Sequence, residues 1–436
     1  MNGELLVVAV EASADLHGAA VLRELRALRP GLRAFGAGGP LLRAQGCETL
    51  VRAEDLSVMG FAEVLPAIPR IFGALRTLRR AAQERRPRAA LLIDSPDFNL
   101  RLARKLRRLG IRVAYFIGPS VWAWRTYRVR QIARDVTRML VILPFEAEFY
   151  ARHGVKAVYV GNPLADGFRT ALPPSSTAPS TSTFPSTLTS PSPATPTSTA
   201  TPPTPIPTST PTPTSTSTPT PIPPPIPPPT PRAELRRALG LDPVRPVLAL
   251  LPGSRRQEVR RLWPALLAAA RLLRGRIPDL QLVVPVAPTV SRDSLPADIP
   301  VTFVEGRAPD VLAASDAAVV ASGTATLEAA LAQVPTVVVY RLSWLSWFVG
   351  RLLVRVPFVS LVNLLAGGRL VPELLQRDCT GGRIAESAAP LLTAGQARDA
   401  QLEGMRQIRA GLAPAGSSGA ARHVADEVAA LLGDAR

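Results

Sequence analysis

The sequence is poor in cysteine, histidine and aromatic residues. Its 436 residues include two cysteines and three histidines, and aromatic residues make up 5%. Cys47 and Cys379 stand alone, without the paired spacing of a metal or redox site. This favours a reducing compartment over a disulfide framework. No metal site and no cofactor are expected from this set of side chains.

Long uncharged apolar runs are also missing. The longest candidate, residues 342–350, is closed off by Arg341 and Arg351 and falls short of the roughly 18 apolar residues that indicate a membrane-spanning helix. Glu4 and Glu11 flank the first apolar run, whereas a secretory signal has a basic start and a longer apolar stretch. We therefore expect neither a membrane-spanning helix nor a signal peptide.

What the chain does have is positive charge. The formal net charge is +18, and arginine supplies nearly all of it because lysine occurs only at Lys105 and Lys156. Such a field favours phosphates, nucleic acid or an anionic membrane surface as partners. No recognised nucleic-acid module is present, so we expect no nucleic-acid partner. The alternative, a basic nucleic-acid-binding protein, would show steeply salt-dependent binding.

Residues 172–231 divide the chain. This segment, here called the linker, carries no charge and consists almost wholly of Pro, Thr and Ser. It cannot bury a core, which predicts a disordered, partly polyproline-II connection. An O-glycosylated stalk of an exported protein is the less favoured alternative because no signal peptide is expected. The resulting domains are 1–171 and 232–436, and the C-terminal helices are candidates to return to the N-terminal domain.

Short apolar segments alternate with helical patterns on both sides of the linker. Strands are expected over residues 5–10, 89–93, 112–117, 139–143, 246–251, 281–286, 317–321 and 336–340. Helices are expected over 18–28 and 100–109, among others. This alternation predicts an α/β protein with two Rossmann-like parallel-sheet domains that face a cleft. Ligands of such sheets bind at the carboxyl ends of the strands.

Two segments at predicted strand ends carry the chemistry. Asp94 directly follows an apolar strand and is placed to accept a proton from an attacking hydroxyl. Pro96 is expected to stop an immediate helix, and Asp97 is a candidate helix cap rather than a second acid. Residues 322–328 open a helix after another strand, and Glu328 lies one turn inside it.

A helix start of this kind is a phosphate site, because exposed N–H groups and the helix dipole attract anions. A capped helix with a first-turn acid is the alternative. Residues 252–255 add a glycine turn with Ser254 and Arg255, which either bind phosphate or form a plain strand-to-helix turn. Together the two segments favour phosphate binding, with Glu328 accepting ribose hydroxyls. His17 is either a base or acceptor-site donor, or a structural histidine.

Two stretches suggest contact with an anionic membrane. Apolar side chains recur at helical spacing from Ile68 to Leu78, with arginines between them. Trp344, Trp347 and Phe348 form a second candidate near Arg351. Both patterns fit a basic amphipathic segment on a membrane, and both equally fit packing against the protein's own core.

The chain resembles the lipid-A-disaccharide synthase family along nearly its whole length outside the linker. The resemblance rests on ordered motifs: Glu11-Ala12-Ser13, residues 93–99, the Trp122-Ala123-Trp124-Arg125 run, Gly161-Asn162-Pro163, residues 251–255, residues 321–328 and residues 363–367. It implies a GT-B fold and inverting glycosyl transfer. UDP-2,3-diacylglucosamine is the implied donor, and 2,3-diacylglucosamine 1-phosphate is the implied acceptor. The products are a β-1,6-linked disaccharide and UDP.

The resemblance also assigns residues. It implies Asp94 as catalytic base, and we add His17 as a second catalytic candidate. It further implies an N-terminal acceptor domain, a C-terminal UDP-sugar domain, and a cytoplasmic location at the inner face of the cytoplasmic membrane. The expected substrate-binding residues are Glu11, Ser13, Trp124, Arg125, Asn162, Gly253, Ser254, Arg255, Ser322, Gly323, Thr324, Glu328 and Asn363.

The sequence departs from the family pattern at a few positions. Val10 and Ala14 stand where the family usually has glycine, and Gly368 replaces the usual arginine. The alternatives are therefore an inactive family member, a different lipid glycosyl transfer, or a UDP-sugar epimerase of the same fold. The sequence leaves the oligomeric state open.

Overall fold

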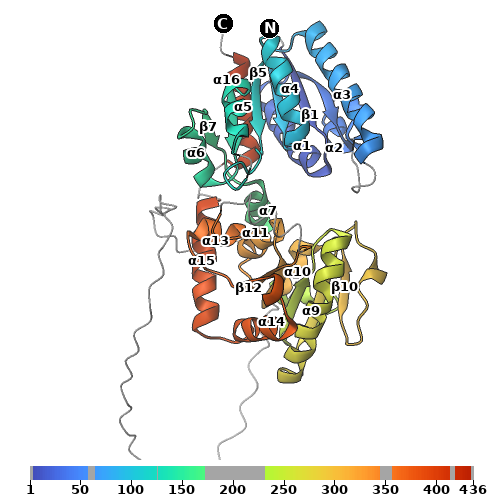
Figure 1. Ribbon diagram of the computed structural model, residues 1–436, viewed down its shortest axis with the longest axis vertical. Helices are drawn as coiled ribbons and strands as arrows, with labels where there is room; N and C mark the ends of the chain where they lie inside the picture. The colour runs from blue at the N-terminus through green and yellow to red at the C-terminus, as the bar shows by residue number, and fades with distance from the viewer. Residues whose placement is uncertain are drawn as a thin grey trace, which may run out of the picture.

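Figure 1 shows a computed structural model of the protein. It describes residues 3–56, 64–124, 126–171, 231–343, 356–412 and 418–433. The described elements form two stacked α/β halves (Figure 1), as the sequence predicts.

The N-terminal half is built on a seven-stranded parallel sheet in the order β3-β2-β1-β4-β5-β6-β7. The strands are β1 (Glu4–Ala9), β2 (Arg33–Gly38), β3 (Glu48–Arg52), β4 (Ala89–Ile93), β5 (Arg112–Phe116), β6 (Arg138–Val141) and β7 (Ala157–Tyr159). Alternate side chains along β1 enter different cores. Leu6 and Val8 pack toward one face of the sheet, and Leu5 and Val7 pack toward the other. Because both faces are buried, the central strands read as unbroken apolar runs.

Helices cover both faces of this sheet. The core on one face takes side chains from α3 (Val64–Arg85), α4 (Pro96–Arg108) and α5 (Arg128–Asp135). The core on the other face takes them from α1 (Ala12–Leu28), α2 (Pro40–Ala44) and α16 (Ala420–Gly433). The last described helix of the chain therefore packs on the first sheet. The Arg138–Glu427 ion pair also joins α16 to β6.

The C-terminal half has a six-stranded parallel sheet in the order β10-β9-β8-β11-β12-β13. Its strands are β8 (Val247–Leu251), β9 (Gln281–Val286), β10 (Thr302–Glu305), β11 (Ala317–Ala321), β12 (Thr336–Tyr340) and β13 (Glu373–Leu375). One face is covered by α9 (Arg256–Arg276) and α14 (Gly381–Ala388). The other is covered by α8 (Pro231–Ala238), α10 (Ala308–Ala314), α11 (Thr324–Leu331), α13 (Leu361–Ala366) and α15 (Gln396–Leu412).

An apolar seam joins the two halves. Leu143 precedes α6 (Pro144–Ala151), and Ala165 and Phe168 lie on α7 (Pro163–Ala171). These side chains are buried in the same cluster as Leu327 and Leu331 of α11. The cluster fixes the carboxyl ends of the first sheet opposite the start of α11, which positions the site described below.

Three local expectations are wrong. Pro96 does not stop a helix: it is the first residue of α4, a position where its missing N–H has no intrahelical partner to lose. Asp97 is not the cap, because Ser95 occupies the N-cap position. Helix α1 also begins at Ala12 rather than Gly18, which places His17 on a helix instead of in a loop.

The described part of the amphipathic stripe of α3 divides between core and surface. Leu75 and Leu78 are buried against the N-terminal sheet, whereas Phe72 is 46% exposed. The second membrane candidate, Trp344 to Phe348, lies outside the described residues. No described helix is long and apolar enough to span a membrane.

The placement of the linker generates a prediction. Phe168 on α7 and Pro231 at the start of α8 line one cavity, so the chain leaves and re-enters the fold at the same place. Replacing residues 172–230 by a short Gly/Ser loop should leave the midpoint of thermal unfolding close to that of the full chain, because lengthening a surface connection costs little free energy. Circular dichroism during heating measures this. A product that does not fold cooperatively would contradict the linker assignment.

Candidate active site

Asp94 occupies a strained turn at the end of β4. Asp94 and Ser95 both adopt left-handed backbone conformations, with φ of 53° and 45°. Side chains other than glycine seldom adopt this conformation, and two in succession must be held by their surroundings. The Asp94 carbonyl accepts hydrogen bonds from the Tyr115 hydroxyl at 2.6 Å and from the Asn99 amide at 2.8 Å. These bonds hold the turn so that the Asp94 carboxyl lines a cavity.

The Asp94 carboxyl has a raised pKa. Burial is the main cause, repulsion from the Glu11 carboxylate adds to it, and a hydrogen bond from the Ser95 backbone opposes it. Glu11 also accepts a hydrogen bond from the Ser95 hydroxyl at 2.7 Å. A carboxyl whose pKa rises toward the working pH is a better proton acceptor when ionised. Glu11 is therefore a neighbour of the Asp94 turn and does not line the cavity.

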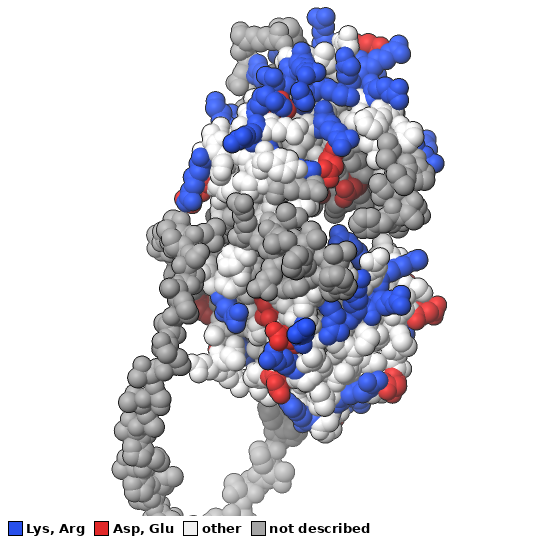
Figure 2. Space-filling model, viewed as in Figure 1, with Lys and Arg blue, Asp and Glu red and all other residues white. Residues whose placement is uncertain are grey.

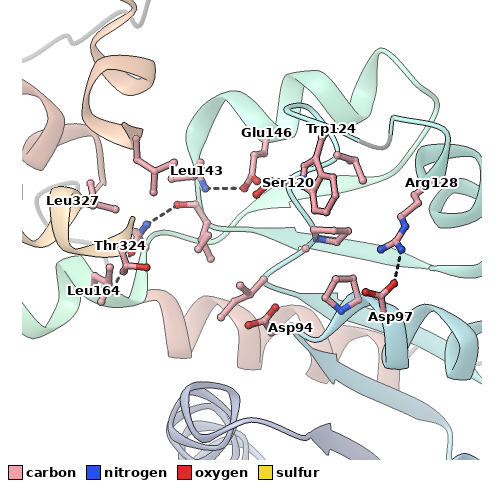
Figure 3. Close-up of a pocket in the computed structure, with 18 of the residues that line it drawn as sticks. Asp94, Asp97, Ser120, Trp124, Arg128, Leu143, Glu146, Leu164, Thr324 and Leu327 are labelled. Atoms are coloured by element: carbon pink, nitrogen blue, oxygen red, sulfur yellow. Dashed lines mark hydrogen bonds and ion pairs between the residues drawn. The ribbon is translucent and has the colours of Figure 1, made fainter. Parts of the chain in front are cut away.

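The cavity around Asp94 has a volume of about 580 Å³ and is lined by both halves of the protein. Trp124 and Asn162 contribute from the N-terminal half, and Arg255, Thr324 and Leu327 contribute from the C-terminal half. Figure 3 shows Asp94 between Thr324 on one side and the Asp97–Arg128 pair on the other. The two sheet ends that the sequence places far apart thus open into one crevice.

The start of α11 has an open N-cap glycine. Gly323 is the N-cap residue with φ of 153°, a conformation that L side chains rarely adopt. A Cβ built there meets no atom within 4 Å, so the backbone N–H groups at this helix start are open to a ligand. Thr324 is exposed and lines the cavity. Ser322 donates its hydroxyl to the Val359 carbonyl and supports the turn.

Arg255, from the second candidate phosphate motif at residues 252–255, also lines the Asp94 cavity. It is the N-cap residue of α9, and its side chain is 80% exposed and pairs with Glu258 at 3.2 Å. Gly253 has φ of 102°, and a glycine in this conformation lets the backbone of the turn approach a phosphate closely. The Ser254 carbonyl accepts a hydrogen bond from the Thr289 hydroxyl. The exposed Arg255 guanidinium can turn from Glu258 toward an anion in the crevice.

His17 and Glu328 line a second cavity, of about 1270 Å³, which Leu164 and Phe168 of α7 also line. Burial lowers the pKa of His17 and raises that of Glu328. The structure therefore does not bring His17 into the cavity that contains Asp94. Leu164 lines both cavities, so they adjoin, and Thr324 and Glu328 are separated by about one helical turn, or roughly 6 Å along α11.

Of the remaining residues predicted to bind substrate, one lines the Asp94 cavity, two lie outside both cavities and one is not described. Asn162 is buried and holds α7, since its amide contacts the carbonyl of Ile142 and the N–H of Leu164. Asn363 is fully buried, and its side chain bonds to residues 370–373. It lines neither of these two cavities, and its side chain holds the loop that leads into β13. Ser13 is exposed outside both cavities, and Arg125 lies outside the described residues.

The sequence analysis missed Glu146, which also lines the Asp94 cavity. Burial raises its pKa to about 7. Its carboxylate accepts the indole N–H of Trp122 at 2.9 Å and the N–H of Leu143 at 3.1 Å. These contacts tie the Trp122–Trp124 run to α6, which holds Trp124 at the cavity. A lone glutamate after a Pro-Phe pair gives no signal of this contact from sequence.

The family departures at Val10 and Ala14 are accommodated in the packing. Both side chains are buried in the cores of the N-terminal half, with exposed fractions of 6% and 1%. Neither is among the residues that line the two cavities. The added side chains, an isopropyl group at Val10 and a methyl group at Ala14, therefore fill core space away from the two cavities.

Solved structures with similar folds include sugar-nucleotide enzymes. A putative UDP-N-acetylglucosamine 2-epimerase from Listeria monocytogenes aligns with a TM-score of 0.57 and 12% identity over 99% of this chain and 95% of its own. The glycotransferase of kitacinnamycin aligns with a TM-score of 0.55 and 14% identity over 99% of each chain. At these identities the likeness concerns the fold, which is the two-domain arrangement of GT-B glycosyltransferases.

Sequence relatives are much closer. The family model described as lipid-A-disaccharide synthetase matches residues 5–180 and 221–425, leaving the middle of the linker unmatched. The lipid-A-disaccharide synthase of Anaeromyxobacter dehalogenans (strain 2CP-C) is 48% identical over 99% of this chain and 98% of its own length. That of Myxococcus xanthus (strain DK1622) is 46% identical over 98% and 97%. The chain belongs to the lipid-A-disaccharide synthase family of hexosyltransferases.

Proposed function

We propose that the protein condenses UDP-2,3-diacylglucosamine with 2,3-diacylglucosamine 1-phosphate to the β-1,6-linked disaccharide phosphate and releases UDP. The observation that carries this proposal is the single crevice in which a carboxylate of one half faces the anion-binding helix start of the other. The family supports the substrates, and the epimerase alternative has support from the fold alone.

The reaction follows from this arrangement. The Asp94 carboxylate accepts the proton of the acceptor hydroxyl while the hydroxyl oxygen bonds to the anomeric carbon of the donor. The bond from that carbon to the diphosphate oxygen breaks, and its electron pair stays on the leaving UDP. The N–H groups at the start of α11 and the Arg255 guanidinium stabilise the charge that grows on the diphosphate. The attack comes from the side opposite the leaving group, which inverts the anomeric centre.

The nucleotide extends from this point along α11. With the diphosphate at Thr324, the ribose reaches Glu328 one turn away, past Leu164 and into the second cavity. No described residue makes a hydrogen bond to the Glu328 carboxylate, so it is available to accept two ribose hydroxyls.

Replacing Asp94 by Asn tests the base. Asparagine tolerates the left-handed backbone and keeps the size of the side chain, but it cannot take a proton. We expect kcat to fall by about 10²- to 10⁴-fold with an unchanged dissociation constant for UDP. Mass spectrometry of the disaccharide and calorimetry with UDP measure the two quantities. Glu328→Gln is the matched variant: it should weaken UDP binding and retain most of kcat at saturating donor. Full turnover by Asp94→Asn would refute the base.

Glu11 supplies a pH prediction. Because Asp94 works as its carboxylate and Glu11 raises its pKa, activity is lost on acidification earlier than for an ordinary aspartate. Glu11→Gln removes the repulsion and retains a hydrogen-bond acceptor for the Ser95 hydroxyl. The pH at which kcat falls on acidification should therefore be lower in this variant. Glu148→Gln, an equal charge change on the exposed face of α6, should not move it. If kcat of Glu11→Gln falls at the same pH as that of the wild type, Glu11 does not raise the pKa of the Asp94 carboxyl.

We also propose that the protein binds the inner face of the cytoplasmic membrane, where acylated substrates reside, through α3 and α4. Figure 2 shows Lys and Arg crowded over the N-terminal half in this view. Arg79, Arg104 and Arg108 are exposed and make no ion pair with a described carboxylate. Phe72 is exposed beside them, with Arg101 over its ring at 5.9 Å. Basic side chains around an exposed aromatic ring suit an anionic lipid surface.

The membrane proposal is tested with charge-matched double variants. Arg104→Gln with Arg108→Gln should weaken partition onto phosphatidylglycerol-containing vesicles by about 30-fold, since each cation near the surface contributes about 1 kcal/mol. Arg260→Gln with Arg276→Gln removes the same charge from α9 in the other half and should change partition little. Vesicle sedimentation measures both. Equal losses in the two double variants would mean that net charge, rather than this face, governs binding.

A further inference from the structure

Two cationic side chains line the Asp94 cavity within the described part of the chain. Arg255 comes from the C-terminal half and Arg128 from the N-terminal half. Under the proposed function the two substrates also bring two separate anionic groups, the diphosphate of the donor and the phosphate of the acceptor. Arg255 and the start of α11 account for the diphosphate. The second phosphate still needs a cation.

The position of Arg128 fits this need. Figure 3 shows Thr324 and Arg128 on opposite sides of Asp94, and Asp97 pairs with Arg128 at the far side. In an inverting transfer the acceptor hydroxyl approaches from the side opposite the diphosphate. An acceptor whose hydroxyl meets Asp94 therefore extends its remaining ring toward Arg128.

The burial of Arg128 is not matched by that of its partner. The Arg128 side chain is 13% exposed, whereas the side chain of Asp97 is 72% exposed. An ion pair with a solvated carboxylate contributes little free energy, and the half-buried guanidinium still lacks a desolvated anion. Asp97 also lines the cavity, and because its side chain is exposed it can turn into solvent when a phosphate takes its place beside Arg128. A planar guanidinium also matches phosphate in a bidentate geometry.

Arg128 is fixed in place by the fold. It is the first residue of α5, whose next residue, Val129, is 2% exposed in the core beneath. Gln131 donates to the Leu100 carbonyl and ties α5 to α4. The guanidinium therefore projects from a packed helix next to the Asp94 turn, as a preorganised contact requires.

We propose that Arg128 binds the phosphate monoester of the acceptor sugar and makes the enzyme prefer a phosphorylated acceptor. The proposal rests on the proposed function for the identity of the acceptor. The sequence motifs indicate Arg125, three residues earlier, rather than Arg128.

The test compares acceptors with and without the phosphate in detergent micelles. Arg128→Gln should raise the KM for 2,3-diacylglucosamine 1-phosphate by about 10- to 100-fold and leave the KM for the phosphate-free sugar unchanged. Arg128→Lys should retain part of the preference for the phosphorylated acceptor, because lysine keeps the positive charge but cannot bind phosphate in the bidentate geometry of a guanidinium. Arg130→Gln is the matched control: Arg130 is exposed two residues along α5 and lines neither cavity. An unchanged UDP affinity in every variant reports intact folding.

Two results would overturn the proposal. If Arg128→Gln raises both KM values equally, the residue has only a structural role. If it alters neither KM value, the phosphate binds elsewhere.

A binding measurement distinguishes failure of the phosphate subsite from failure of the proposed function. NMR titration with glucosamine 1-phosphate and with glucosamine needs no turnover. Phosphate-dependent binding to the wild type that is lost in Arg128→Gln supports the subsite, and equal binding by both proteins contradicts it.

Discussion

The apolar seam between the two halves is the constraint on which the site depends. Phe168 of α7 and Leu143 before α6 belong to the N-terminal half of the chain, yet they are buried in the same cluster as Leu327 of α11. Burial of such side chains contributes roughly 1.5–3 kcal/mol each. Leu327 has a second role, because it also lines the Asp94 cavity. Packing that holds the halves together thus sets the separation between base and phosphate site.

Strain and burial at β4 then give Asp94 its chemistry. A turn with two left-handed non-glycine residues is stable because Tyr115, Asn99 and Glu11 bond to it. The same surroundings withdraw the carboxyl from water and raise its pKa. Structure and reactivity therefore have a common origin: Tyr115 of β5 and Asn99 of α4 donate the hydrogen bonds that hold the turn, and the turn directs the carboxyl into the crevice.

The sequence predicted the parts of the fold whose pattern is local. The central strands β1, β4, β8 and β11 are buried on both faces and appear as unbroken apolar runs. Strands β2 and β13 were not predicted: β2 reads Arg-Ala-Phe-Gly-Ala-Gly, and β13 has three residues. Such segments have weak strand propensity and are stabilised by pairing with a neighbour.

The site was predictable to the extent that strand ends define it. Asp94, Arg255 and Thr324 follow predicted strands, and the sheet topology brings them together. Asn363 was chosen from a motif, but its amide completes a loop. Arg128 and Glu146 were missed because their importance lies in burial and in partners far along the chain. No periodicity or spacing encodes those distances.

A crystal structure of the protein with UDP bound tests the central claim most directly, namely that the two halves form one crevice for donor and base. The account predicts electron density for the diphosphate against the N–H groups at the start of α11, beside Arg255 and facing Asp94. A diphosphate bound on any surface away from Asp94 would contradict it.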